Sequence, residues 1–288
     1  MIVPASTAQS LAAALAGELD EPLATPTFDR FPDGELMTSV SGLGNDDPVP
    51  ERAVVVAATV SSDAHLEVLQ LQDALAEAGV ERVVTVLSYM GYGRQEKAFE
   101  SGQPVSARAV ARAISTGTDR VLTVTPHEEA VCEYFDVPAS AVDGETVLAE
   151  PLARDLEQPL FLAPDEGAVE LAETVRAAYP GDGAVDHFVK TRHSPTEVTV
   201  EPRDTAVAGR DVVIVDDEIA TGGTMSEAVR ALHDRDVARV FACCVHPLLV
   251  GNAVTRLANA GVADLFGTDT IERAQSRVSV APVIAETL

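Results

Sequence analysis

The chain has 288 residues, enough for one large α/β domain or for two domains of about 140 residues each. Its 46 acidic residues against 20 Lys and Arg give a net charge of −26, while a hydrophobic share of 46% excludes a disordered acidic chain. The charge leaves no basic patch for nucleic acid, and the three cysteines lack the spacing of a disulfide framework or a zinc site.

The N-terminal residues 1–20 do not have the features of a secretory signal. They lack a basic first segment and carry an acid at Glu18. No later apolar stretch reaches the roughly 20 residues of a membrane span. We therefore expect a cytoplasmic protein that contacts no membrane.

Short apolar runs alternate with helical patterns through the first half. Residues 54–60, 83–87 and 121–124 are β-rich runs, and apolar residues recur at helical spacing from Val68 to Ala78. Strands that alternate with helices are typical of βαβ units and of a mainly parallel sheet.

The same alternation starts again after a turn-rich stretch near Asp143 and Gly144. The expected strands are residues 160–163, 212–216 and 240–245, with helices over 168–178 and from 225 onward. We predict an α/β fold of two similar halves, residues 1–145 and residues 146–288.

Four unusual segments follow expected strands. In open α/β sheets ligands lie beyond the carboxyl ends of the strands, so these segments form the candidate site. They are residues 88–97, 125–127, 163–167 and 216–224.

The last of them, residues 216–224, reads DDEIATGGT and joins a strand to a helix. Its glycines let backbone N–H groups face inward, and the helix start adds positive potential, so the turn can hold an anion such as phosphate. Asp216 and Asp217 can accept hydrogen bonds from vicinal sugar hydroxyls or bind a divalent cation. The pattern predicts a sugar phosphate site; the alternative is a glycine-rich turn with an acidic helix cap.

This loop resembles the ribose-phosphate loop that type I phosphoribosyltransferases share with ribose-phosphate pyrophosphokinases. Further segments resemble motifs of the second family, in order, between residues 28 and 283. They are the nucleotide-contacting turn Phe31-Pro32-Asp33-Gly34-Glu35, the adenine loop Arg94-Gln95-Glu96-Lys97, His127, the pyrophosphate loop Pro164-Asp165-Glu166-Gly167, and Lys190-Thr191-Arg192 of the catalytic loop.

The resemblance implies two phosphoribosyltransferase-like domains and transfer of the diphosphoryl group of ATP to O1 of ribose 5-phosphate, with Mg²⁺, giving phosphoribosyl pyrophosphate and AMP. It implies site residues of four kinds. The catalytic pair is Lys190 and Arg192; the ATP-binding residues are Phe31, Asp33, Glu35, Arg94, Gln95, Lys97 and His127; the ribose 5-phosphate residues are Asp216, Asp217, Thr221, Gly222, Gly223 and Thr224; the metal-linked residues are His127 and Asp165.

The chain departs from the family pattern at three positions. Thr125 stands where an Asp is usual two residues before the histidine, Glu96 stands for Asp in the adenine loop, and Ala168 stands for a second glycine. These departures leave a non-catalytic regulatory paralogue as one alternative. The other is a phosphoribosyltransferase, which would need one α/β domain with a hood instead of two halves.

The family's nucleotide-contacting turn reaches the ATP site of a neighbouring subunit, so the resemblance also implies a homodimer or larger oligomer. The composition adds a prediction of its own. Only two lysines, Lys97 and Lys190, occur in this very acidic chain, which suits a halophilic cytoplasm where salt screens self-repulsion. The alternative is an acidic surface that mimics nucleic acid.

Overall fold

The computed structural model describes residues 1–43, 49–152, 156–192, 198–202 and 205–288, and only the backbone of residues 190–192 and 198–202. The chain folds into two compact units. The first contains Met1–Asp143, Asp269–Glu272 and Ser279–Leu288, and the second contains Gly144–Thr268 and Arg273–Val278. The described part of the chain has no helix that combines the length and the apolar character needed to cross a membrane.

The first unit is built on a five-stranded sheet whose neighbouring strands are all parallel. Its strands, in spatial order, are β1 (Ile2–Pro4), β4 (Arg52–Ala58), β5 (Arg82–Tyr89), β6 (Arg120–Val124) and β7 (Ala139–Val142). The apolar runs at their centres are buried on both faces, as a parallel sheet covered by helices requires.

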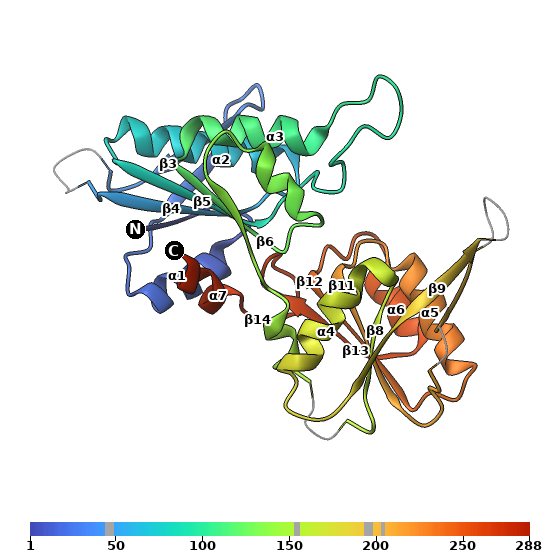
Figure 1. Ribbon diagram of the computed structural model, residues 1–288. Coiled ribbons are helices and arrows are strands. Elements are labelled where there is room, and N and C mark those ends of the chain that lie inside the picture. Colours follow the sequence, from blue (N-terminus) through green and yellow to red (C-terminus); the bar gives the residue numbers. More distant parts are fainter. Residues whose placement is uncertain (44–48, 153–155, 193–197, 203–204) are drawn as a thin grey trace. The chain divides into compact units, whose positions relative to one another are not determined.

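Helices cover both faces of this sheet. Figure 1 shows α2 (Ser62–Glu77) and α3 (Ser106–Ile114) on one face, and α1 (Gln9–Leu19) and α7 (Ala281–Thr287) on the other. The Oγ of Ser61 caps α2 by accepting the Ala64 N–H at 3.1 Å. The apolar stripe of α2 is buried in a core shared with β4, β5 and α3.

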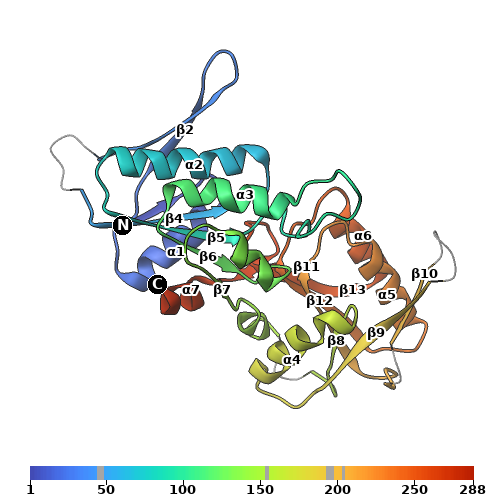
Figure 2. The same cartoon turned by 45° about the horizontal axis from the view of Figure 1, so that its top comes forward.

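An antiparallel hairpin of the first unit, β2 (Pro26–Arg30) and β3 (Leu36–Val40), extends beside α2 and is separate from the five-stranded sheet (Figure 2). Gln70 of α2 ties it down. Its side-chain amide donates to Leu36 O at 2.8 Å, and its Oε1 accepts the Thr38 N–H at 2.9 Å. The end of β3 next to the turn is therefore fixed to the helix, while the turn itself is exposed.

The second unit is built on a seven-stranded sheet that is parallel except for one edge pair. Its strands, in spatial order, are β10 (Val198–Pro202), β9 (Ala184–Arg192), β8 (Leu160–Ala163), β11 (Asp211–Glu218), β12 (Arg239–His246), β13 (Val262–Thr268) and β14 (Ser276–Val278). The strand order reverses between β8 and β11, so their carboxyl ends border a topological switch point, where α/β proteins bind ligands.

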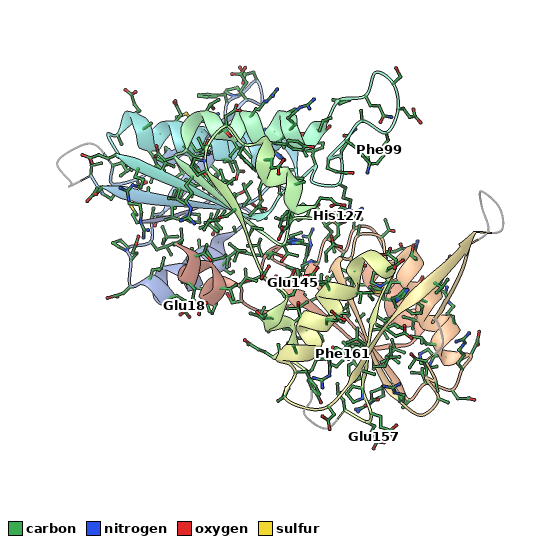
Figure 3. All side chains as sticks on the ribbon, viewed as in Figure 1. Glu18, Phe99, His127, Glu145, Glu157 and Phe161 are labelled. Carbon is green, nitrogen blue, oxygen red and sulfur yellow. The ribbon has the colours of Figure 1, made fainter. Side chains whose placement is uncertain are left out.

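In the second unit α4 (Val169–Ala178) lies on one face of the sheet, and α5 (Gly223–His233) with α6 (Ala253–Ala260) on the other (Figures 1 and 2). Met225, Val229 and Leu232 of α5 and Leu257 of α6 pack into one buried cluster against the strands. Phe161 of β8 is fully buried on the α4 side of this unit (Figure 3).

The two units repeat one order of elements: strand, helix, antiparallel hairpin, then strands alternating with two helices and a final strand. This confirms the predicted α/β class with two halves and mainly parallel sheets. The domain boundary after residue 145 stays a prediction. The two compact units depart from this boundary, because Asp269–Glu272 and Ser279–Leu288 belong to the first unit. There Arg120 donates to Thr287 O at 3.2 Å.

Candidate functional site

The predicted sugar-phosphate loop begins in the last residues of β11, at the switch point of the second unit, and runs into α5. Asp216 and Asp217 are part-buried near the end of β11, and α5 begins at Gly223. Gly222 has a left-handed backbone with φ of 65°, and a Cβ on it would lie 3.2 Å from Cγ of Leu257. Both the backbone conformation and the close contact therefore favour glycine at this position.

The carboxylates of the site repel one another. The Asp217 N–H donates to Oδ1 of Asp216 at 3.0 Å, and the Glu218 N–H donates to Oδ1 of Asp217 at 2.8 Å. Even so, burial, followed by the charges of Asp217 and Asp165, raises the pKa of Asp216 well above its ordinary 3.8. The site therefore favours a ligand that brings a cation or hydrogen-bond donors to these oxygens.

Asp165, whose charge also raises the pKa of Asp216, lies in the loop after β8, the strand beside β11. Its Oδ1 accepts the Gly167 N–H at 3.2 Å, so the side chain caps the short helix Glu166–Ala168. Strand order thus brings together Asp165 and Asp216, which are far apart in sequence, as the expectation about carboxyl ends requires.

A second loop, after β12, supports the sugar-phosphate loop through backbone hydrogen bonds. Ile219 N–H donates to His246 O at 3.2 Å, and Leu249 N–H donates to Ile219 O at 2.9 Å. His246 is 3% exposed and Glu218, its register partner on β11, is 8% exposed. Sequence reasoning gave this loop no role, because only the pairing of β11 with β12 places it there.

In the first unit the predicted nucleotide-contacting turn closes the β2–β3 hairpin. Phe31 N–H donates to Glu35 O at 2.9 Å, and Oδ1 of Asp33 accepts the Glu35 N–H at 3.1 Å. Gly34 takes a left-handed φ of 95°. The Phe31 ring stays 48% exposed, so an ordered turn presents an aromatic face and two acids to solvent.

The predicted adenine loop follows β5 in the same unit. Ser106 Oγ donates to Oε1 of Gln95 at 2.5 Å, which fixes the amide at the start of α3. Lys97 Nζ lies 3.0 Å from Glu96 Oε1 and 5.5 Å from the Phe99 ring centre. The Lys97 hydrogen bond lowers the pKa of Glu96, and the Glu96 hydrogen bond raises the pKa of Lys97.

His127 comes from the loop after β6, and its charge also lowers the pKa of Glu96, so this loop lies near the adenine loop (Figure 3). Two residues earlier, Thr125 is 8% exposed and has a φ of 36°, which a β-branched residue rarely adopts. Backbone strain of this kind concentrates at functional sites.

The remaining predicted residues are placed only in part. Lys190 and Arg192 lie on β9, opposite Val200 and Val198 of β10, and their side chains fall outside the described residues. The predicted metal-linked residues His127 and Asp165 belong to different units. Among the described residues, no three His, Cys, Asp or Glu side chains form a set that could hold a metal.

Two family models match the chain. Residues 1–117 match the N-terminal domain of ribose phosphate pyrophosphokinase, and residues 131–266 match a phosphoribosyl transferase domain. Curated relatives cover the same length. The chain is 59% identical over 288 residues to a ribose-phosphate pyrophosphokinase of Halobacterium salinarum, covering 100% of both chains. It is 42% identical to that of Methanosarcina mazei, covering 100% of this chain and 94% of the relative.

A solved structure agrees with these sequence relatives. The crystal structure of phosphoribosylpyrophosphate synthetase from Mycobacterium smegmatis matches with a TM-score of 0.82 at 27% identity, covering 100% of this chain and 96% of that one. The match spans both units and supports the phosphoribosyltransferase-type fold of each.

Proposed function

The chain belongs to the ribose-phosphate pyrophosphokinase family and is an enzyme of that class, and from this premise we propose its reaction. The enzyme transfers the β,γ-diphosphoryl group of ATP to O1 of ribose 5-phosphate and releases phosphoribosyl pyrophosphate and AMP. The observation that carries the proposal is the loop of residues 216–224, where two acids precede a glycine-rich helix start at a switch point.

The ribose 5-phosphate binds along this loop. Asp216 and Asp217 accept hydrogen bonds from the vicinal ribose hydroxyls, since their oxygens are crowded by like charge and gain from donors. The amides and hydroxyls of Thr221, Gly222, Gly223 and Thr224 surround the 5-phosphate at the positive end of α5.

ATP binds to the loops of the first unit. Arg94 and Gln95 contact the adenine, where a guanidinium can stack on the purine and a fixed amide can read its edge. Lys97 and His127 bind the ATP phosphates. Phe31, Asp33 and Glu35 of the hairpin turn are further ATP-binding residues. These assignments rest on the motif match and on the exposure and order of both loops.

Mg²⁺ supplies charge neutralisation on the transferred group when it is bound. The oxygen donors at Asp165 and Asp216 fit this ion, because a cation would offset the burial and the carboxylate repulsion that together raise the pKa of Asp216. Mg²⁺ is commonly held by one or two carboxylates together with substrate phosphates, so neither Asp165 in the second unit nor His127 in the first needs a complete set of protein ligands around it.

Lys190 and Arg192 provide the positive charge that the transition state requires. Attack of a sugar hydroxyl on the β-phosphorus spreads negative charge over phosphoryl oxygens, and cationic side chains stabilise that charge. Both residues belong to β9, the strand next to the edge strand β10 of the second unit's sheet.

One observation favours a second candidate function. Thr125 replaces the family's usual Asp, and a non-catalytic regulatory paralogue would tolerate that loss. The decisive assay supplies ATP, Mg²⁺ and ribose 5-phosphate in molar salt and identifies the nucleotide product. AMP with phosphoribosyl pyrophosphate supports the proposed reaction; ligand binding without turnover supports the paralogue, and ADP as product contradicts the reaction.

We further propose a homodimer or larger oligomer that works in a halophilic cytoplasm. ATP and ribose 5-phosphate are metabolites of that compartment, and the net charge of −26 needs salt to screen its self-repulsion. Helical content and activity should both fall when the protein is dialysed from molar to about 0.1 M salt. Unchanged circular dichroism and turnover would contradict the halophilic assignment.

A further inference from the structure

Arg256, a residue of α6 that sequence reasoning did not select, lies against the sugar-phosphate loop. A Cβ built on Gly223 would be 3.2 Å from Nη1 of Arg256 and 3.7 Å from Oγ1 of Thr221. The guanidinium and the Thr221 hydroxyl therefore lie on the same side of Gly223, the first residue of α5. A larger residue at position 223 would displace one of them.

The guanidinium of Arg256 is held without a carboxylate. Among the described residues its side-chain hydrogen bond goes from Nη2 to Oδ1 of Asn252 at 3.3 Å, one helical turn earlier. Arg277 in the same unit makes two bonds to Asp264, at 2.5 and 2.6 Å. In a chain with 46 acidic residues, a partly buried arginine oriented by a neutral amide leaves Nη1 available to a ligand anion.

The loop needs such a charge. Residues 216–224 contain no basic side chain, and the carboxylates of Asp216 and Asp217 lie at the start of the same loop, with Asp165 on the neighbouring one. A phosphate dianion would be repelled by these carboxylates. The start of α5 supplies only about half an elementary positive charge, so the loop amides by themselves offset little of the repulsion between the phosphate and these carboxylates.

We propose that Arg256 binds the 5-phosphate of ribose 5-phosphate, with Nη1 donating to a phosphate oxygen beside Thr221, and that it selects phosphorylated over unphosphorylated ribose. The inference rests on the proposed function of this loop. Asn252 is a positioning residue that holds the other arm of the guanidinium.

The test compares Arg256→Gln with Arg230→Gln in one molar-salt buffer. Arg230 lies in the last turn of α5 and is exposed, so this control removes the same charge from the same unit away from the loop. A charge-assisted hydrogen bond lost in Arg256→Gln should raise KM for ribose 5-phosphate about 10- to 100-fold. KM for ATP and the inhibition constant of unphosphorylated ribose should stay within about twofold.

Calorimetric binding of ribose 5-phosphate should show the same loss, and Arg256→Lys should recover part of the affinity because it keeps the charge. If Arg256→Gln does not fold, Arg256→Lys replaces it in the test. Its KM for ribose 5-phosphate should then exceed that of the wild type, but by less than the increase expected for the glutamine variant. Equal losses for ribose and ribose 5-phosphate, or for ATP, would overturn the phosphate role, as would an unchanged KM. A wild-type enzyme that forms no AMP would instead contradict the proposed function.

Discussion

The backbone N–H of Asp217 donates a 3.0 Å hydrogen bond to Oδ1 of Asp216, the same carboxylate whose ionisation the Asp217 side chain opposes. The hydrogen bond lowers the pKa of Asp216, but burial and the carboxylate repulsion outweigh it. The pair therefore stores electrostatic free energy in the folded enzyme that a cation or a sugar ligand can release.

Asp216→Asn should stabilise the protein without ligand at neutral pH. A folded-state pKa above the unfolded value of 3.8 means that Asp216 stabilises the fold below about pH 3.8 and loses this contribution as the pH rises through the folded pKa. The melting temperature of the asparagine variant, relative to the wild type, should therefore rise from about pH 4 to pH 8. A variant that melts below the wild type at pH 8 would contradict this.

Asp216→Asn and Asp217→Asn should each weaken ribose 5-phosphate while leaving ATP binding nearly intact. An amide keeps the shape of the carboxylate but loses charge-assisted acceptance from the ribose hydroxyls, which should cost about tenfold or more in affinity. Titration calorimetry with each substrate separately measures both effects. If ATP affinity alone fell, the loop would belong to the nucleotide.

Gly222→Ala should raise KM for ribose 5-phosphate and lower the free energy of unfolding, with Gly209→Ala as the matched control. Both glycines have left-handed backbones, with φ of 65° and 72°, so each substitution costs about 1 to 2 kcal/mol of strain. Only the Gly222 Cβ meets Leu257, at 3.2 Å, whereas nothing lies within 4 Å of the Gly209 Cβ. Equal KM values for the two variants would show that the loop tolerates displacement.

Lys190→Ala should lower kcat by about 10³ with little change in either KM, if the side chain acts on transition-state charge. Lys97→Ala is the contrasting variant. Lys97 is 70% exposed and paired with Glu96, so its loss should act mainly on KM for ATP. Steady-state kinetics on both variants separate the two roles, and a Lys190→Ala enzyme within a few fold of wild type would remove Lys190 from the catalytic loop.

Complementation should reveal active sites that need residues from two subunits. An enzyme altered at Glu35 and another altered at Asp216 should each be inactive, yet co-expressed chains should regain activity because some mixed dimers hold one intact combination. Differential tags isolate the mixed species. Mixed dimers no more active than either parent, or a monomer with full turnover in sedimentation, would exclude a shared site.

Much of the fold could be predicted from the sequence, because buried strands and helices leave apolar patterns in it. The apolar run predicted as the strand 160–163 is β8, Leu160–Ala163, and the helix expected from Ala168 to Ala178 is α4, Val169–Ala178. Continuous apolar runs and helical periodicity record which faces are covered, so these elements could be predicted locally.

Elements that depend on distant partners could not be predicted in this way. The short helix α7 and the β2–β3 hairpin have weak periodicity, and each is held by another part of the chain. At the site, residues 216–224 carried their own signal, whereas Arg256 and His246 did not. Their proximity to the loop follows from the pairing of β11 with β12 and the packing of α6 on α5, which no local pattern encodes.

The return of Ala281–Thr287 to the first unit has a consequence for how the protein is made. During synthesis the second unit emerges with almost all of its strands before α7 leaves the ribosome, while the face of the first sheet that α1 and α7 cover still lacks one helix. Ala281 and Ile284, which are buried, follow every described strand of the second unit in the sequence. The first unit is therefore completed after the second, and released chains truncated before residue 280 should expose protease-sensitive sites mainly in the first unit.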